Sequence, residues 1–98
     1  MHSRRPLSTV EIDERMTERP EWSLVEGRRL HRTFTFNDFV QAFGWMTRVA
    51  MVAEKLDHHP NWTNVYKTVD VQLWTHDVGG LTPLDFELAA AMDRLAGG

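Results

Sequence analysis

In residues 61–76, NWTNVYKTVDVQLWTH, apolar and polar side chains begin to alternate. A repeat of two residues is typical of a β-strand with one buried face. We predict a short strand over residues 63–68 and a longer one over residues 69–76. The core-facing row of the longer strand is Val69, Val71, Leu73 and Thr75. The opposite row is Asp70, Gln72, Trp74 and His76.

The segment before these strands predicts a helix with two apolar faces, capped by Asn37 or Asp38 and ending near Leu56. One face consists of Phe39, Phe43, Met46, Ala50 and Ala53. The other consists of Trp45, Val49, Val52 and Leu56. A surface helix of a single domain needs only one apolar face, so we expect another subunit to cover the second.

Nearer the N-terminus, Ser8 and Glu11 have the spacing of a capping box at the start of a short helix. Strands are predicted over residues 22–25 and 30–36. Gly27 lies between them, where glycine supplies the positive φ of a hairpin turn.

At the other end of the chain, Thr82-Pro83-Leu84-Asp85 starts a last helix with a cap residue, a proline and an acid in the first turn. The resulting order, αββαββα, predicts an α+β fold with a four-stranded antiparallel sheet and helices packed on one face. We expect a single domain over residues 8–98, preceded by a flexible arm over residues 1–7.

Length and composition restrict the classes of function. A chain of 98 residues has room for one domain, and the absence of cysteine excludes disulfides and thiolate zinc sites. The net charge of −3 disfavours a nucleic-acid binder, which usually carries a basic excess. The sequence contains no apolar stretch of about 18 residues, the length needed to cross a membrane. The first residues lack the apolar run of a secretory signal, so we expect a cytoplasmic protein.

The chemistry-bearing side chains gather in residues 54–66 and 75–82, near the ends of a predicted helix and strand. Histidine exchanges protons near neutral pH, so His58, His59 and His76 suit proton removal at one atom and delivery at another. Carboxylates that could orient the imidazoles are Glu54, Asp57, Asp77 and Asp85.

Simpler interpretations stand beside this one. His58 could interact favourably with a helix C-terminus, and Asp85 could serve only as the capping acid for Thr82. Trp62 and Tyr66 are typical of core or interface aromatics. A metal site is the competing chemistry, but the chain lacks the His-x-x-x-His spacing that places two ligands on one helical face.

The histidine segment resembles the pterin-4a-carbinolamine dehydratase family. The matching positions are Glu54, His58, His59, Pro60, Tyr66, His76 and Asp85. Residues 75–82 also match the sequence motif typical of the family in this segment. Trp74 departs from the pattern, since a smaller residue is expected before Thr75-His76.

The resemblance implies a hydro-lyase that dehydrates 4a-hydroxytetrahydrobiopterin, or a related tetrahydropterin, to the quinonoid dihydropterin and so recycles the cofactor of aromatic amino-acid hydroxylases. By analogy His58, His59 and His76 are the acid–base set, and no metal or cofactor is required. Glu54, Asp57 and Asp85 would orient imidazoles or substrate, and Pro60 and Trp62 would shape the pocket wall. Family members form homodimers or homotetramers.

An assembly module on the same fold is the alternative class of function. Relatives stabilise a transcription-factor dimer or assist Rubisco assembly, and the second group tends to lose the catalytic histidines. This chain keeps all three histidines, which disfavours a purely non-catalytic role and leaves a dual role open.

Overall fold

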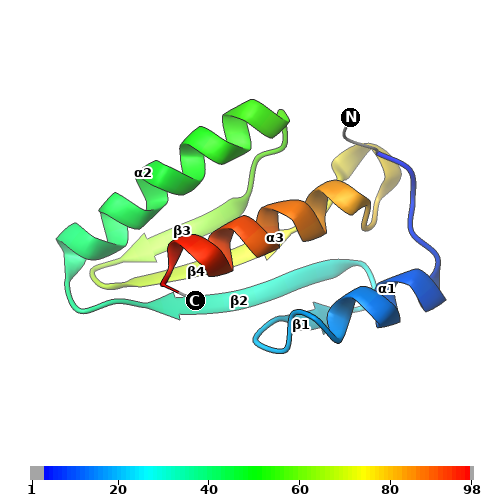
Figure 1. Ribbon diagram of the computed structural model, residues 1–98, viewed down its shortest axis with the longest axis horizontal. Coiled ribbons are helices and arrows are strands. Elements are labelled where there is room, and N and C mark those ends of the chain that lie inside the picture. The colour runs from blue at the N-terminus through cyan, green and yellow to red at the C-terminus, as the bar shows by residue number, and fades with distance from the viewer. Residues whose placement is uncertain (1–3, 98) are drawn as a thin grey trace.

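The computed structural model describes residues 4–97, and the elements follow the predicted order αββαββα (Figure 1). They are α1 (Thr9–Met16), β1 (Ser23–Val25), β2 (Arg29–Thr35), α2 (Phe39–Leu56), β3 (Asn61–Val65), β4 (Thr68–Leu73), the 3₁₀ helix η1 (His76–Val78) and α3 (Pro83–Leu95). The four strands form one sheet in the order β1-β2-β4-β3, and every neighbouring pair is antiparallel. The predicted α+β class is confirmed.

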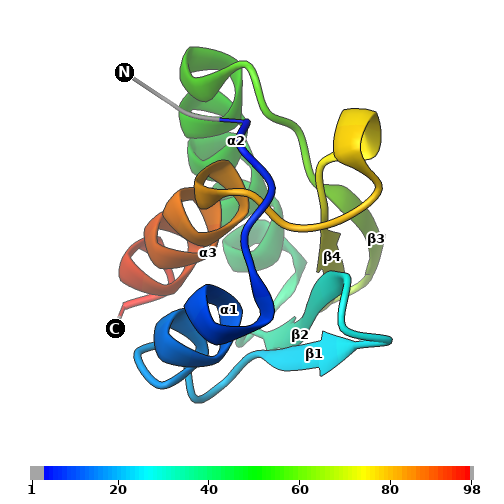
Figure 2. The ribbon, with the colours of Figure 1, turned by 90° about the vertical axis from the view of Figure 1, so that its right-hand side faces the viewer.

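The three α-helices lie on one face of the sheet and leave the other face open (Figure 2). The core between the layers joins Leu30 and Phe34 of β2 to Trp45 of α2 and Met92 of α3, all almost fully buried. The rings of Phe34 and Trp45 are 4.4 Å apart, and Trp45 Nε1 donates to the carbonyl of Met92 at 3.1 Å. An indole N–H buried with its acceptor ties α2 to α3 without leaving a polar atom unpaired.

The strand boundaries differ from the prediction, although the alternation of faces holds. The hairpin turn lies at Tyr66-Lys67, where Tyr66 takes φ 53°, so β3 and β4 each begin and end earlier than expected. Val69, Val71 and Leu73 are fully buried, as the pattern predicts.

The prediction that the last strand runs to His76 is wrong. Thr75 N–H donates to the carbonyl of Gly80 at 2.8 Å, so the chain pairs with itself beyond β4. Gly79 takes φ 64° to close this loop, a conformation that suits glycine. His76 therefore begins η1, outside the sheet.

Helix α2 is capped by Asp38, whose Oδ1 accepts from Gln41 N–H at 2.8 Å. Of its two apolar faces, the one with Trp45 and Val49 is buried against the core. The other predicted face is divided: Phe39 and Phe43 are exposed, 46% and 54% respectively, whereas Met46 and Ala53 pack against the core. The large apolar side chains that α2 exposes are Phe39, Val40, Phe43 and Met51. Within residues 4–97 no helix is both long and apolar enough to span a membrane.

A single carboxylate anchors the N-terminal part of the chain to α3. Asp93 accepts from Trp22 Nε1 and Arg19 Nη1, each at 2.9 Å, and from Arg32 Nη1. Arg32 also lies over the ring of Phe34, 4.1 Å from its centroid. Arg19 and Trp22 precede β1, and Arg32 lies in β2. The three hydrogen bonds therefore hold the β1–β2 hairpin against α3.

The capping box at the start of α1 is present. Ser8 N–H donates to Glu11 Oε1 at 2.9 Å, and Glu11 N–H donates to Ser8 Oγ at 3.2 Å. Residues 4–7, assigned from the sequence to the flexible arm, also contact the domain: Leu7 is buried and its N–H donates to Leu81 O at 2.9 Å. Residues 1–3 of that arm lie outside the described residues.

The Arg5–Glu11 pair predicts a pH-dependent stability. Two hydrogen bonds of 3.0 Å from the Arg5 guanidinium, reinforced by Ser8, lower the pKa of Glu11 from 4.5 to about 2. A lowered carboxyl pKa stabilises the fold above the unfolded-state value, and this contribution is lost as the pH falls toward 2. We expect Glu11→Gln to lower the Tm at pH 7 and to leave it unchanged near pH 2. Melting curves of both proteins across this range test the prediction, and a difference independent of pH would contradict it.

Candidate functional site

A cavity of about 350 Å³ opens where the end of α2, the start of β3 and the loop after β4 meet. Its size falls in the range of small-molecule sites. The lining residues are Arg4, Asp57, His58, His59, Pro60, Asn61, Trp74, Thr75, His76 and Asp77. The fold therefore brings the three histidines singled out in the sequence to one cavity, from two segments of the chain.

The end of α2 places the adjacent histidines. Asp57 terminates the helix in the left-handed conformation, with φ 52°, and His58 N–H donates to the carbonyl of Ala53 at 3.0 Å. The chain then becomes extended toward Pro60, so the two imidazoles diverge. The side chain of His58 is 7% exposed and that of His59 is 58% exposed. The site thus has one buried and one accessible imidazole.

The buried part of the site is built around Asp85. Its Oδ1 lies 2.6 Å from His58 Nε2, and its Oδ2 accepts from Thr75 Oγ1 and from Thr82 N–H, both at 2.9 Å. The hydroxyls of Thr75 and Thr82 are paired at 2.9 Å. Because an ionised carboxylate only accepts hydrogen bonds, it holds the His58 proton on Nε2 and leaves Nδ1 as the basic nitrogen.

His59 has a carboxylate partner of its own. Its Nε2 lies 2.9 Å from Glu54 Oε1, one turn back on α2. Glu54 is largely exposed, so this pair is solvated, in contrast to the buried His58–Asp85 pair. The same tautomer argument leaves Nδ1 of His59 as its basic nitrogen.

His76 is held differently. Its ring is 4.6 Å from the ring of Trp74, centroid to centroid, with the planes inclined at 35°. Its Nε2 lies 3.5 Å from Nδ2 of Asn61, at the long limit for a hydrogen bond. Within the described part of the chain, no carboxylate contacts His76. It is therefore the least constrained of the three imidazoles.

The remaining predicted residues occupy different places. Asp57 and Pro60 line the cavity, whereas Glu54 and Asp85 stand behind the histidines as hydrogen-bond partners. The structure does not bring Trp62 to this cavity: its half-buried ring packs toward Trp45, 6.0 Å away.

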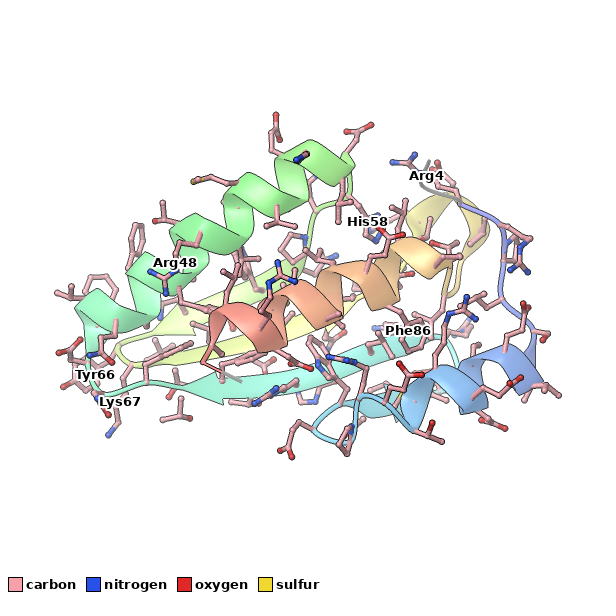
Figure 3. All side chains as sticks on the ribbon, in the orientation of Figure 1. Arg4, Arg48, His58, Tyr66, Lys67 and Phe86 are labelled. Carbon is pink, nitrogen blue, oxygen red and sulfur yellow. The ribbon has the colours of Figure 1, made fainter. Side chains whose placement is uncertain are left out.

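Tyr66, another position of the resemblance, lies in the β3–β4 turn at the opposite end of the molecule from His58 (Figure 3). Its side chain is 61% exposed there. It therefore belongs to the turn rather than to the histidine cavity.

The cavity also contains residues that sequence reasoning did not select. Arg4 reaches it from the N-terminal segment, and its guanidinium donates to the carbonyl of Asp57 (Figure 3). Asn61 and Thr75 complete the wall next to His76. Arg4 is 53 residues from Asp57 in sequence, so no local pattern connects the two.

Another histidine, His31, has an acidic partner outside the cavity. Its Nε2 lies 2.7 Å from Asp70 Oδ1, which also accepts from Thr33 Oγ1 at 2.8 Å. The hydrogen bond to His31 lowers the pKa of Asp70. These residues come together through the β2–β4 register, in which Thr33 opposes Asp70.

The competing interpretation is a metal site, which needs several histidines or carboxylates around one point. No three side chains among the histidines and carboxylates of residues 4–97 converge closely enough to hold an ion. What the arrangement offers is proton transfer: three imidazoles on one cavity, two of them oriented by carboxylates.

Comparison with known proteins assigns the family. A family model described as pterin 4 alpha carbinolamine dehydratase matches residues 5–95. The chain belongs to that family. The match covers every element of the fold and every histidine of the cavity, and it confirms the family suggested by the histidine segment.

Two relatives of this pterin dehydratase family member cover three quarters or more of its length. A protein of Chelativorans sp. (strain BNC1), provisionally named a pterin-4-alpha-carbinolamine dehydratase, is 57% identical over 96% of this chain and 97% of its own. A provisionally named dehydratase of Jannaschia sp. (strain CCS1) is 66% identical over 76% of this chain and 78% of its own.

Two solved structures share the fold. The crystal structure of a transcriptional coactivator/pterin dehydratase from Brucella melitensis has a TM-score of 0.90 and 44% identity, covering 94% of this chain and 99% of that one. A pterin dehydratase-like Rubisco assembly factor of the alpha-carboxysome has a TM-score of 0.68 and 22% identity, covering 80% and 92%. The second similarity concerns the fold alone.

Proposed function

We propose that this protein dehydrates 4a-hydroxytetrahydropterins, such as 4a-hydroxytetrahydrobiopterin, and so regenerates the pterin cofactor of aromatic amino-acid hydroxylases. In this reaction the C4a–O bond breaks, the proton on N5 is removed and C4a=N5 forms, giving the quinonoid dihydropterin and water. The departing hydroxyl takes up a proton. The reaction is redox-neutral, so the proposed mechanism uses no cofactor.

The observation that carries the proposal is the convergence of His58, His59 and His76 on one cavity. The reaction needs a base near N5 and an acid near the C4a hydroxyl, and imidazoles serve both roles near neutral pH. In the proposal Asp85 and Glu54 keep the basic Nδ1 atoms of their histidines available, while Asp57 and Pro60 contribute to the wall around the pterin.

Turnover by the purified protein tests this function. We expect it to accelerate dehydration of enzymatically generated 4a-hydroxytetrahydrobiopterin above the rate in buffer, followed by absorbance of the quinonoid product. Exhaustive treatment with a chelator is expected to leave the rate unchanged, because the proposed proton transfers require no ion. A rate equal to that of buffer would reject the function, and a loss of activity restored by a metal would reject the mechanism.

We also propose that the protein forms a homodimer or homotetramer. The support is the exposed apolar face of α2, in which Val40 is 77%, Phe43 54% and Met51 66% exposed. Apolar side chains gathered on one helix favour a protein contact, and a second copy would cover them.

Self-association through α2 makes a direct prediction. The native protein at micromolar concentration is expected to scatter light as a dimer or tetramer, and Phe43→Glu is expected to reduce its mass. The charge would be buried without a partner in the contact. Val65→Glu, at an exposed position of β3 outside this face, is the matched control and should keep the native mass. A monomeric native protein would contradict the prediction.

A further inference from the structure

Trp74 forms a wall shared by two hollows of the surface. One is the histidine cavity, and the other is a smaller cavity of about 230 Å³ lined by Arg28, Arg29, Trp74 and Gly79. The ring that stacks against His76 therefore also borders a basic recess at the tip of the β1–β2 hairpin.

Arg29, at the start of β2, lies beside Trp74, which directly follows the last residue of β4. Leu30 pairs with Leu73 in the β2–β4 register, so Arg29 and Trp74 occupy the next opposing positions. The guanidinium carbon of Arg29 lies 5.2 Å from the centroid of the Trp74 ring, and Nη1 is 3.4 Å from Gln72 Oε1. An aromatic face and a neutral amide orient the guanidinium while leaving its charge intact.

The charge of Arg29 is not neutralised by a neighbour. Among residues 4–97 no carboxylate lies within ion-pair distance of its guanidinium, whereas the adjacent Arg28 pairs with Glu26 at 3.6 Å. A guanidinium held over a ring beside a ligand cavity is suited to phosphate or carboxylate, because its planar donors match two oxygens of either group.

The connection to the histidine cavity is short. The centroid of the Trp74 ring is 4.6 Å from the centroid of the His76 ring and 5.2 Å from the guanidinium carbon of Arg29. Trp74 therefore lies between His76 and Arg29. A flat ligand beside His76 with a flexible substituent of a few bonds could pass Trp74 and reach Arg29.

We propose that Arg29 and Trp74 form a subsite for an anionic group on the substituent of the pterin, so that the preferred substrate carries a phosphorylated or carboxylated side chain. This inference rests on the proposed function, since it places the pterin ring in the histidine cavity. Trp74 supports the substituent and Arg29 binds the oxyanion.

Matched pterin pairs test the subsite by binding. Neopterin and neopterin 3′-monophosphate differ only in the phosphate, and 6-(4-hydroxybutyl)pterin and 6-(3-carboxypropyl)pterin differ in a terminal carboxylate at similar length. We expect the anionic member of at least one pair to bind about five- to tenfold more tightly at low salt, a preference that should shrink as salt screens it. The pair that shows the preference identifies the group.

Variants assign the preference to its residue. Arg29→Gln is expected to equalise the affinities within the preferred pair, and Arg29→Lys to keep part of the difference. Lys67→Gln removes a positive charge from the β3–β4 turn, outside both cavities, and should keep the preference. Equal affinities within both pairs in the native protein, or a preference that survives Arg29→Gln, would overturn the subsite.

Failure of the subsite is distinguishable from failure of the function. A protein that dehydrates neutral 4a-hydroxytetrahydrobiopterin but shows no anion preference keeps the function and loses the subsite. A protein that shows neither turnover nor binding of any of the four pterins loses both.

Discussion

Replacing His59 with alanine is expected to lower kcat/KM for 4a-hydroxytetrahydrobiopterin by about 10²- to 10⁴-fold, the usual contribution of a positioned general acid or base. His59 is the accessible imidazole of the cavity, and its Nε2 is already engaged by Glu54. The contact with Glu54 favours the tautomer in which Nδ1 is the basic nitrogen, and alanine offers no such atom.

Two controls make the His59 measurement specific. His31→Ala removes an imidazole outside the cavity, paired with Asp70, and should keep kcat/KM close to the native value. Glu54→Gln retains an acceptor for His59 without the charge and should reduce the rate less than His59→Ala. A His59→Ala protein that keeps native kcat/KM would remove this residue from the mechanism.

Replacing Asp85 with asparagine is expected to lower the free energy of unfolding by about 2–4 kcal/mol and to reduce kcat as well. The carboxylate is fully buried and accepts from His58, Thr75 and Thr82. An amide presents one nitrogen that cannot accept, so at least one of these groups must lose its partner or, in the case of His58, change its tautomer.

Urea unfolding and steady-state kinetics measure the two effects of Asp85→Asn separately. Thr75→Val is the matched control for stability: it removes one donor to Asp85 but leaves the His58 bond, so we expect a smaller loss of about 1–2 kcal/mol. If the Asp85→Asn protein unfolds at the same urea concentration as the native protein, the buried network does not stabilise the fold as predicted.

Much of the fold could be predicted because its signals are local. The capping residues Ser8, Asp38 and Thr82 precede their helices as expected, and period-two burial identifies β4. The end of β4 could not be predicted, because Thr75 and His76 continue the alternation while the backbone of Thr75 pairs with Gly80 instead. Side-chain pattern carries no information on that competing hydrogen bond.

The site was partly predictable for a related reason. His58 and His59 are adjacent in sequence, so their proximity is certain, and the placement of His76 beside them agrees with the family resemblance. Trp62 was assigned to the pocket wall by analogy with the family, yet its position on β3 directs it toward Trp45. The roles assigned to these residues remain predictions.

Contacts set by tertiary structure had no signal in the sequence. The His31–Asp70 bond depends on the register between β2 and β4, and Arg4 reaches the end of α2 from the N-terminal segment. Asp85 shows the opposite limit: helix capping and imidazole orientation were weighed as separate interpretations, and each is carried by a different oxygen of the same carboxylate.

That shared carboxylate couples the start of a helix to the orientation of an imidazole. Because the first turn of α3 and the tautomer of His58 depend on one side chain, no substitution at position 85 can adjust helix stability without also changing the imidazole. Fraying of that turn would displace Asp85 and so release His58 as well.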